Sequence, residues 1–324
     1  MAIPPVVVAA ARSVWHWQWL QLMGGLGPAD AEGNYRRPRS PFAERPPLPV
    51  DAAEPGAHLL IVGRSCPWAH RAWLTWQLRG LQASIRLVVA EPDPAAGRWR
   101  LPDPVLGCGT LQQLYRRGGA APDQRATVPV LLEAGGGRIL VGESARLMEL
   151  LNAWPAPPGA PDLEPAALIP QIRTWRERFQ HAVNDGVYRC GFARTQVAYD
   201  RAEADLFTAL AEAETALAEA QAGPWLCGDA LTLADVQLFP TLIRLELVYA
   251  PLFGVSRRPL WQFPALWRWR QRFYALPGVE ACCFAEAWRR DYYGALFPLN
   301  PSGIVPAAPP LATLVNGLPG AVQP

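Results

Sequence analysis

Apolar residues follow two different patterns along the chain, and the change between them predicts two domains. Between residues 58 and 153, short apolar runs alternate with segments of helical periodicity. Short apolar runs bounded by turn residues are typical of buried strands. The predicted order is strand, helix, strand, helix, strand, strand and helix, over residues 58–62, 67–79, 84–89, 111–117, 127–132, 138–141 and 144–152. This order predicts that residues 58–153 form an α/β domain.

The second pattern begins after residues 154–165, a proline-rich segment that is typical of a linker between domains. Beyond it, apolar residues recur at helical spacing, as in Leu206, Leu210, Ala213 and Leu217. Thr232–Asp235 is a variant of the capping box, with aspartate where glutamate or glutamine is usual, and it predicts an apolar helix that continues to about Tyr249. Residues 166–290 are therefore predicted to form an all-α domain.

The two ends of the chain show no comparable pattern. Residues 1–57 are rich in proline, arginine and tryptophan and have no sustained period, so we expect an N-terminal arm. The pattern leaves open whether this arm is flexible or wraps around the domains in an ordered way. Residues 291–324 are expected to form a C-terminal tail.

Composition excludes several classes of function. The formal net charge is only +2, from 30 basic and 28 acidic residues, so nothing calls for nucleic acid or an anionic membrane. The apolar stretch Ile3–Ala11 is far shorter than the roughly 20 residues of a membrane-spanning helix, and we expect a cytoplasmic protein. Six cysteines and four histidines are scattered along the chain, which favours neither a disulfide framework nor a metal site.

Cys66 has the setting of a reactive thiol. It lies between a predicted buried strand and a helix that begins at Pro67. The unpaired N–H groups of a helix N-terminus favour negative charge, so a thiol there is expected to have a lowered pKa. Arg64 and Arg71 add positive charge nearby in the sequence. Position alone leaves open the alternative of a buried structural cysteine.

Two further segments suggest a peptide-binding site beside Cys66. Val128-Pro129 lies at the start of the strand predicted over residues 127–132, and a proline there leaves unpaired backbone groups with which a bound peptide could pair. Glu143-Ser144 precedes a helix, where free N–H groups can hold a carboxylate, although these residues could also be simple helix caps. Together the three features describe a site for a short peptide with a thiol and a free α-amino acid end.

These motifs resemble those of a known family. A strand followed by Cys-Pro, a Val-Pro, a Glu-Ser and a helical second domain look like a glutathione transferase with a thioredoxin-like first domain. The segment from Cys66 to Arg71, Cys-Pro-Trp-Ala-His-Arg, resembles the motif of the Xi class, the glutathionyl-hydroquinone reductases. The resemblance extends to residues 186–193, 291–294 and 300–306.

The resemblance implies roles for individual residues. Glutathione would be the co-substrate, with no metal, and would contact Trp99, Val128, Pro129, Glu143 and Ser144, with Arg116 as the basic contact. Cys66 would be the nucleophile, and Tyr188 with Tyr292 or Tyr293 would act near the quinone ring. The chain departs from the family in a shorter segment between Trp99 and Val128, and it lacks the family's histidine after the tyrosine pair.

The reaction implied is the reduction of glutathionyl-quinone conjugates through a mixed disulfide between Cys66 and glutathione. Ala69 stands where a dithiol motif has its second cysteine, so a second glutathione would have to resolve that disulfide. Two alternatives remain: an omega-like thiol transferase or reductive dehalogenase, and a non-catalytic binding module. The resemblance also implies a homodimer, for which Trp261, Trp267 and Trp269 offer a surface.

Overall fold

Six strands form a single sheet in the first half of the chain. The computed structural model describes residues 3–94, 96–219 and 223–317. The strands are β1 (His58–Gly63), β2 (Ile85–Asp93), β3 (Arg98–Val105), β4 (Cys108–Thr110), β5 (Val130–Glu133) and β6 (Ile139–Val141). Their order in the sheet is β4-β3-β2-β1-β5-β6. The helices between them are α2 (Pro67–Leu78), α3 (Leu111–Arg117) and α4 (Ser144–Ala153).

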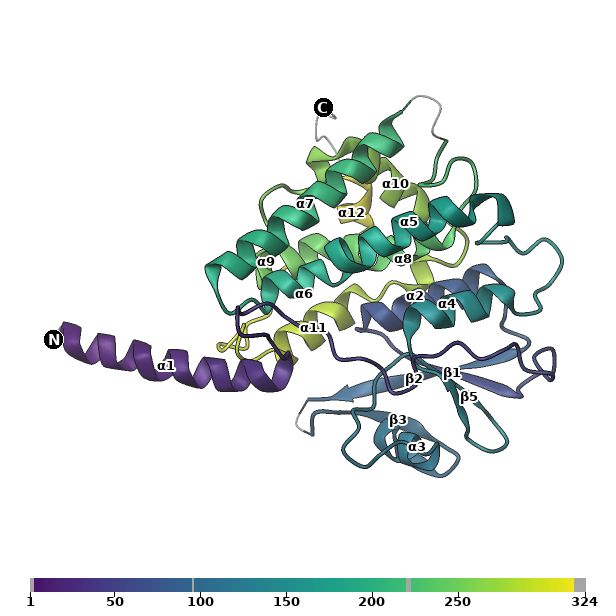
Figure 1. Cartoon of the computed structure of the whole chain (residues 1–324), viewed down its shortest axis with the longest axis horizontal. Coiled ribbons are helices and arrows are strands. Elements are labelled where there is room, and N and C mark those ends of the chain that lie inside the picture. The colour runs from purple at the N-terminus through teal and green to yellow at the C-terminus, as the bar shows by residue number, and fades with distance from the viewer. Residues whose placement is uncertain (1–2, 95, 220–222, 318–324) are drawn as a thin grey trace.

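The central strand β1 organises this domain. All six of its residues are buried, and it pairs in parallel with β2 and antiparallel with β5. Helices α2 and α4 cover the sheet face toward the second domain, and α3 lies on the opposite side (Figure 1). The seven predicted elements are all present, and the predicted α/β fold with a thioredoxin-like order is confirmed.

Strands β3 and β4 were not predicted. They extend the sheet at its edge, and most side chains of β3 are exposed or half-buried. Pro102 and Pro104 interrupt the apolar pattern of β3, and proline is tolerated in a strand mainly at a sheet edge. An edge strand with so little burial therefore lacks the apolar signal of a buried strand.

The second half of the chain is helical, as predicted. Its helices are α5 (Ile169–Phe179), α6 (Gly186–Gly191), α7 (Gln196–Ala218), α8 (Leu233–Leu242), α9 (Ala250–Phe253), α10 (Pro264–Tyr274), α11 (Ala285–Ala295) and α12 (Leu311–Asn316). Shorter turns are η1 (Ala166–Leu168), η2 (Gln180–Asn184), η3 (Leu245–Tyr249), η4 (Leu260–Gln262) and η5 (Glu280–Cys282). Residues 291–295, which we expected in the tail, continue α11, and residues 318–324 of that tail lie outside the described residues.

Helix α8 begins with the predicted capping box. The N–H of Thr232 donates to Asp235 at 2.9 Å, and the fully buried Asp235 also accepts from the indole N–H of Trp269 at 2.9 Å. The predicted helix does not run unbroken to Tyr249: α8 ends at Leu242, and a π-helical turn η3 follows. The segment Leu233–Phe253 is long and apolar enough to cross a membrane, but 78% of that window is buried inside the protein, as in a core helix.

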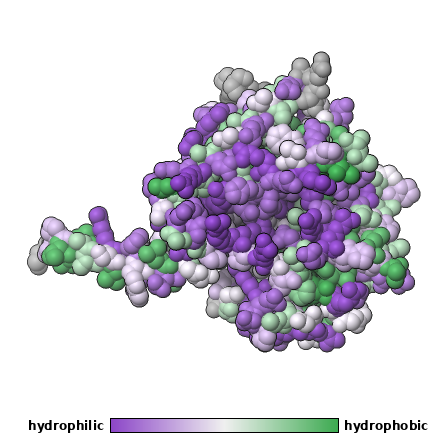
Figure 2. Space-filling model, in the orientation of Figure 1, coloured by the Kyte–Doolittle hydropathy of each residue, from purple (hydrophilic) through white to green (hydrophobic). Residues whose placement is uncertain are grey.

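The N-terminal arm combines a helix with an extended segment. Helix α1 (Pro5–Leu26) projects from the body of the protein, carries apolar surface, and has Met23 as its one buried residue (Figures 1 and 2). Because this helix buries so little, its apolar residues need not gather on one face. The sequence therefore shows no helical period that would predict it. The segment after α1 is an ordered wrap, because the N–H of Gly142 donates to the carbonyl of Phe42 at 2.8 Å and that of Arg194 to Gly33 at 3.0 Å.

His58, at the start of β1, makes the stability of the fold depend on pH. Its imidazole is fully buried, with ring contact to Trp154 and with Asp51 3.5 Å from Nε2. Burial lowers the pKa of His58, and the charge of Asp51 acts in the opposite direction. The unfolded chain, with an ordinary histidine pKa of about 6.5, therefore binds more protons than the folded chain in mild acid.

We expect the free energy of unfolding to be retained above pH 6.5 and to decrease as the pH falls below it, by up to about 1.4 kcal/mol per pH unit for this one proton. Urea unfolding at pH 5 to 8 measures this slope. His58→Leu should reduce it, and His181→Leu, at an exposed histidine, should leave it unchanged. Equal slopes in the wild type and His58→Leu would show that His58 is not responsible.

Candidate active site

A pocket of about 340 Å³ lies where the carboxyl end of β1 meets the helical domain. This volume is at the lower end of the roughly 300–1,000 Å³ of small-molecule sites. Four segments of the first half of the chain line it, namely residues 35–41, 65–68, 127–129 and 142–144. The helical domain contributes Tyr188, Phe192 and Tyr292 from the other side. The pocket therefore exists only when the two domains and the arm are packed together.

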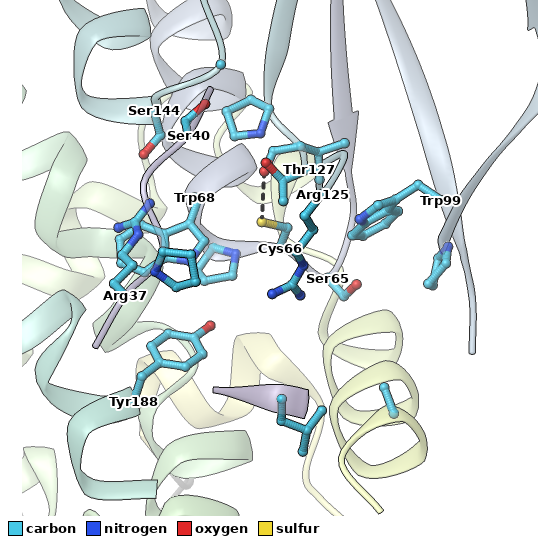
Figure 3. Close-up of a pocket in the computed structure, with 18 of the residues that line it drawn as sticks. Arg37, Ser40, Ser65, Cys66, Trp68, Trp99, Arg125, Thr127, Ser144 and Tyr188 are labelled. Atoms are coloured by element: carbon cyan, nitrogen blue, oxygen red, sulfur yellow. Dashed lines mark hydrogen bonds between the residues drawn. The ribbon is translucent and has the colours of Figure 1, made fainter. Parts of the chain in front are cut away.

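Cys66 lies at the centre of this pocket (Figure 3). It is the N-cap of α2, as predicted, and its Sγ accepts a hydrogen bond from the N–H of Ala69 at 3.5 Å. The thiol also donates to the carbonyl oxygen of Val128 at 3.5 Å (Figure 3). All six cysteines are free thiols, and Cys66 is the one that lines the pocket.

The prediction that Cys66 has a lowered pKa is wrong. Burial raises the pKa of this thiol, and the N–H groups of Ala69 and Trp68 and the charges of Arg244 and Arg37 act against that rise. The expectation counted the helix N-terminus but not the burial of the thiol beneath the arm and the second domain. The sequence analysis also named Arg64 and Arg71 as the nearby positive charges. In the structure, Arg64 lies over the ring of Phe284 and Arg71 over that of Trp68.

Arg37, in the arm, forms one wall of the pocket. Its guanidinium carbon lies 3.5 Å from the centroid of the Trp68 ring, whose other neighbour, Arg71, lies at 4.5 Å. Arg37 also pairs with Glu143 at 3.5 Å and with Asp185 at 3.3 Å, one residue from each domain. Arg37 lies in the proline-rich N-terminal arm, and no pattern in the sequence predicted that it would line the pocket.

The residues predicted to hold a peptide gather on the side of the pocket formed by the first domain. Trp99, Val128, Pro129, Glu143 and Ser144 all line it, and the Val128-Pro129 peptide bond is cis. Glu143 caps α4, where its carboxylate accepts from the N–H of Ala145 at 3.5 Å. Ser144 is buried and accepts from Arg71 at 3.4 Å.

Two predicted residues do not reach the pocket. The guanidinium of Arg116 points instead to the carbonyl of Pro122 at 3.5 Å, on the exposed side of α3. The basic residue of this region that does line the pocket is Arg125 (Figure 3). Tyr293 is buried outside the pocket lining. In the described part of the chain, no group of histidine, cysteine and acidic residues could hold a metal ion.

Three phenols form a chain, of which Tyr188 and Tyr292 line the opposite wall of the pocket. The hydroxyl of Tyr188 lies 2.5 Å from that of Tyr292, which lies 3.2 Å from that of Tyr249. Burial raises the pKa of Tyr188 and of Tyr292 well above the ordinary value, so both are protonated near neutral pH. The structure thus selects Tyr292 from the predicted pair and adds Tyr249, which the sequence analysis missed because it lies 43 residues from Tyr292.

Models of known families match both domains. The model of the N-terminal domain of glutathione S-transferases matches residues 65–154, and that of the C-terminal domain matches residues 196–272. The chain is 34% identical to the glutathionyl-hydroquinone reductase PcpF of Sphingobium chlorophenolicum, over 79% of this chain and 84% of that protein.

Solved structures show the same similarity. The Xi glutathione transferase of Phanerochaete chrysosporium matches with a TM-score of 0.78 and 30% identity, over 87% of this chain and 94% of that one. The glutathione-bound structure of YqjG, a glutathione transferase homologue from Escherichia coli K-12, matches with a TM-score of 0.70 and 30% identity, over 87% of this chain and 91% of that one.

Arg37→Gln is expected to make the thiol of Cys66 less acidic, because it removes one of the charges that oppose the effect of burial. The pH dependence of alkylation of Cys66 by iodoacetamide, followed by mass spectrometry of its peptide, should shift to higher pH. Arg116→Gln, which removes a charge far from the pocket, is the matched control. Identical pH profiles for Arg37→Gln and the wild type would show that Arg37 does not act on the thiol.

Proposed function

Because the chain belongs to the glutathione transferases and, among them, to the Xi class of glutathionyl-hydroquinone reductases, we propose that it reduces glutathionyl-hydroquinones with glutathione. The observation that carries this proposal is a single thiol, Cys66, in a pocket with the residues predicted to hold a peptide on one side and the phenols of Tyr188 and Tyr292 on the other. A conjugate of a peptide and an aromatic ring needs both walls.

Glutathione is proposed to bind along the first domain. The exposed backbone at Val128 would pair with its peptide groups, as a strand pairs with a sheet edge. Glu143 and Ser144, at the N-terminus of α4, would hold the γ-glutamyl end, through its ammonium and its carboxylate respectively. Trp99 would pack on the peptide. Arg125, which lines the pocket, replaces Arg116 as the proposed partner of a glutathione carboxylate.

In the first step, the thiol of Cys66 gives its proton to solvent, and the resulting thiolate attacks the sulfur of the conjugate. A disulfide forms between Cys66 and glutathione, and the bond between that sulfur and the ring carbon breaks. The ring carbon takes the electron pair of this bond and a proton, which the Tyr188–Tyr292 pair supplies. The conjugate is thereby reduced by two electrons to the hydroquinone, and a phenolate remains in the pocket.

In the second step, another glutathione enters as a thiol and gives its proton to the phenolate. Its sulfur attacks the mixed disulfide, which yields oxidised glutathione and the free thiolate of Cys66. Because Ala69 stands in place of a second cysteine, no thiol within the α2 motif competes for this step. One conjugate and one glutathione are consumed in each cycle.

Cys66→Ser should abolish the reduction of glutathionyl-menadione, because a serine hydroxyl is hardly ionised near neutral pH. The rate should fall by several orders of magnitude, as is usual when a nucleophile is removed. Cys283→Ser, which changes a cysteine outside the pocket lining, is the matched control and should retain the rate. If Cys66→Ser kept more than about a tenth of the activity, the covalent route would be wrong.

Tyr188→Phe and Tyr292→Phe should slow conjugate reduction by about 10²–10⁴-fold, the usual contribution of a positioned proton donor. Exchange with a simple glutathione mixed disulfide should be affected much less, since a thiolate leaving group needs no proton from the enzyme. Tyr293→Phe removes a phenol that does not line the pocket and should affect neither reaction. Equal losses on both substrates would indicate structural damage rather than a lost acid.

The same pair of assays separates the proposed function from the omega-like thiol transferase. That alternative predicts efficient disulfide exchange with little reduction of the quinone conjugate. The homodimer and the cytoplasmic location stay predictions. Of the tryptophans predicted to offer a dimer surface, Trp269 is fully buried and cannot do so, whereas Trp261 is exposed.

A further inference from the structure

Arg244 is a positive charge deep in the protein that has no carboxylate beside it. The residue is fully buried, between α8 and η3. Among the described residues, no acidic side chain lies within ion-pair distance of it, and its Nε and Nη2 atoms have no hydrogen-bond partner. Arg270 is equally buried but pairs with Glu246 at 2.8 Å. An uncompensated buried charge is costly, so its retention indicates a use.

The surroundings of Arg244 place it directly behind the Cys66 loop. Its Nη1 donates to the carbonyl of Pro240 at 2.8 Å and lies 2.9 Å from Nδ1 of His70. Its guanidinium stacks at 4.0 Å on the ring of Trp288. His70 follows Cys66 by one helical turn, with its N–H donating to the carbonyl of Cys66 at 3.0 Å.

Through its contact with Trp288, Arg244 is also linked to the backbone that precedes Cys66. The indole N–H of Trp288 donates to the carbonyl of Arg64, two residues before the thiol, at 2.9 Å. Two neighbours of Arg244, one from α2 and one from α11, therefore each hold the backbone beside Cys66. The guanidinium therefore contacts two buried rings, His70 through Nη1 and Trp288 through its face, and these two rings also contact each other.

The side chains whose pKa values are affected by the charge of Arg244 are all uncharged when the enzyme is at rest. They are Cys66 and His70 from α2, Tyr249 from η3, Cys283 before α11, and Tyr292 from α11. Burial raises the pKa of Cys66, Tyr249 and Tyr292, and the charge of Arg244 lowers each of them. The same charge, added to burial, keeps His70 neutral, with a pKa well below its ordinary value.

We propose that Arg244 is a positioning residue whose charge is balanced only during the reaction, by the thiolate of Cys66 and then by the phenolate of Tyr292. The thiolate part concerns the free enzyme, and the phenolate part rests on the function proposed above. Since a neutral His70 accepts a hydrogen bond from Arg244 rather than repelling it, the charge is held one helical turn from Cys66.

Alkylation of Cys66 by iodoacetamide tests the thiolate part without any quinone conjugate. Arg244→Gln should slow alkylation at pH 7 by about tenfold or more and shift its pH profile to higher pH, the effect of losing one nearby charge in a buried site. Arg244→Lys should restore most of the rate because it restores the charge. Arg270→Gln, at the buried arginine paired with Glu246, should leave the profile unchanged. A folded Arg244→Gln variant with the wild-type profile would overturn the proposal.

A second measurement needs no change at Arg244, in case that variant does not fold. Salt screens exposed charges much more than buried ones. In Arg37→Gln, which lacks the partly exposed arginine of the pocket wall, the alkylation profile should be the same at low and high ionic strength. A profile that moves with salt would assign the remaining charge to surface groups and overturn the proposal. Neither result depends on conjugate reduction, so the proposed function can fail or hold separately.

Discussion

The proposed chemistry depends on one constraint: a negative sulfur must form at Cys66, in a pocket enclosed by both domains and the arm. Burial of Cys66 opposes its ionisation, and a buried charge is stable only where fixed dipoles or opposite charges surround it. The protein supplies both. N–H groups at the start of α2 donate to the sulfur, and the charges of two arginines act on it, Arg37 at the pocket wall and Arg244 in the second domain.

These compensating groups come from parts of the chain that only the tertiary fold unites. Arg37 belongs to the arm, Cys66 to the first domain and Arg244 to the second. The arm does more than cover the pocket. Its Arg37 forms ion pairs with Glu143 of the first domain and Asp185 of the second, and so links the two domains at the pocket. Packing of α2 against α8 places Arg244 behind the thiol. The charges that oppose the effect of burial on the thiol are therefore in place only when the arm and both domains are packed together.

The opposite wall has the complementary chemistry. Burial keeps Tyr188 and Tyr292 protonated, while the same burial works against the thiolate. In the proposed reaction, Cys66 must lose its proton before it attacks, and Tyr292 must still carry the proton that it donates. The N–H groups at the start of α2 act on the sulfur of Cys66 and favour its ionisation. This division suits a reaction in which one group attacks as an anion and the other donates a proton.

The sequence by itself determined the local structure: the seven elements around β1, the capping box of α8 and the position of Cys66 at a helix N-terminus. Periodicity and capping involve residues a few positions apart, so they can be recognised without the fold. It did not determine α1 or β3, which bury too little to leave a pattern. Only the tertiary structure decided that Arg125 rather than Arg116 lines the pocket, that Tyr292 rather than Tyr293 joins Tyr188, and that Arg37 and Arg244 flank the thiol. Burial and charge at Cys66 depend on residues far away in the chain, and distances between such residues are set by packing.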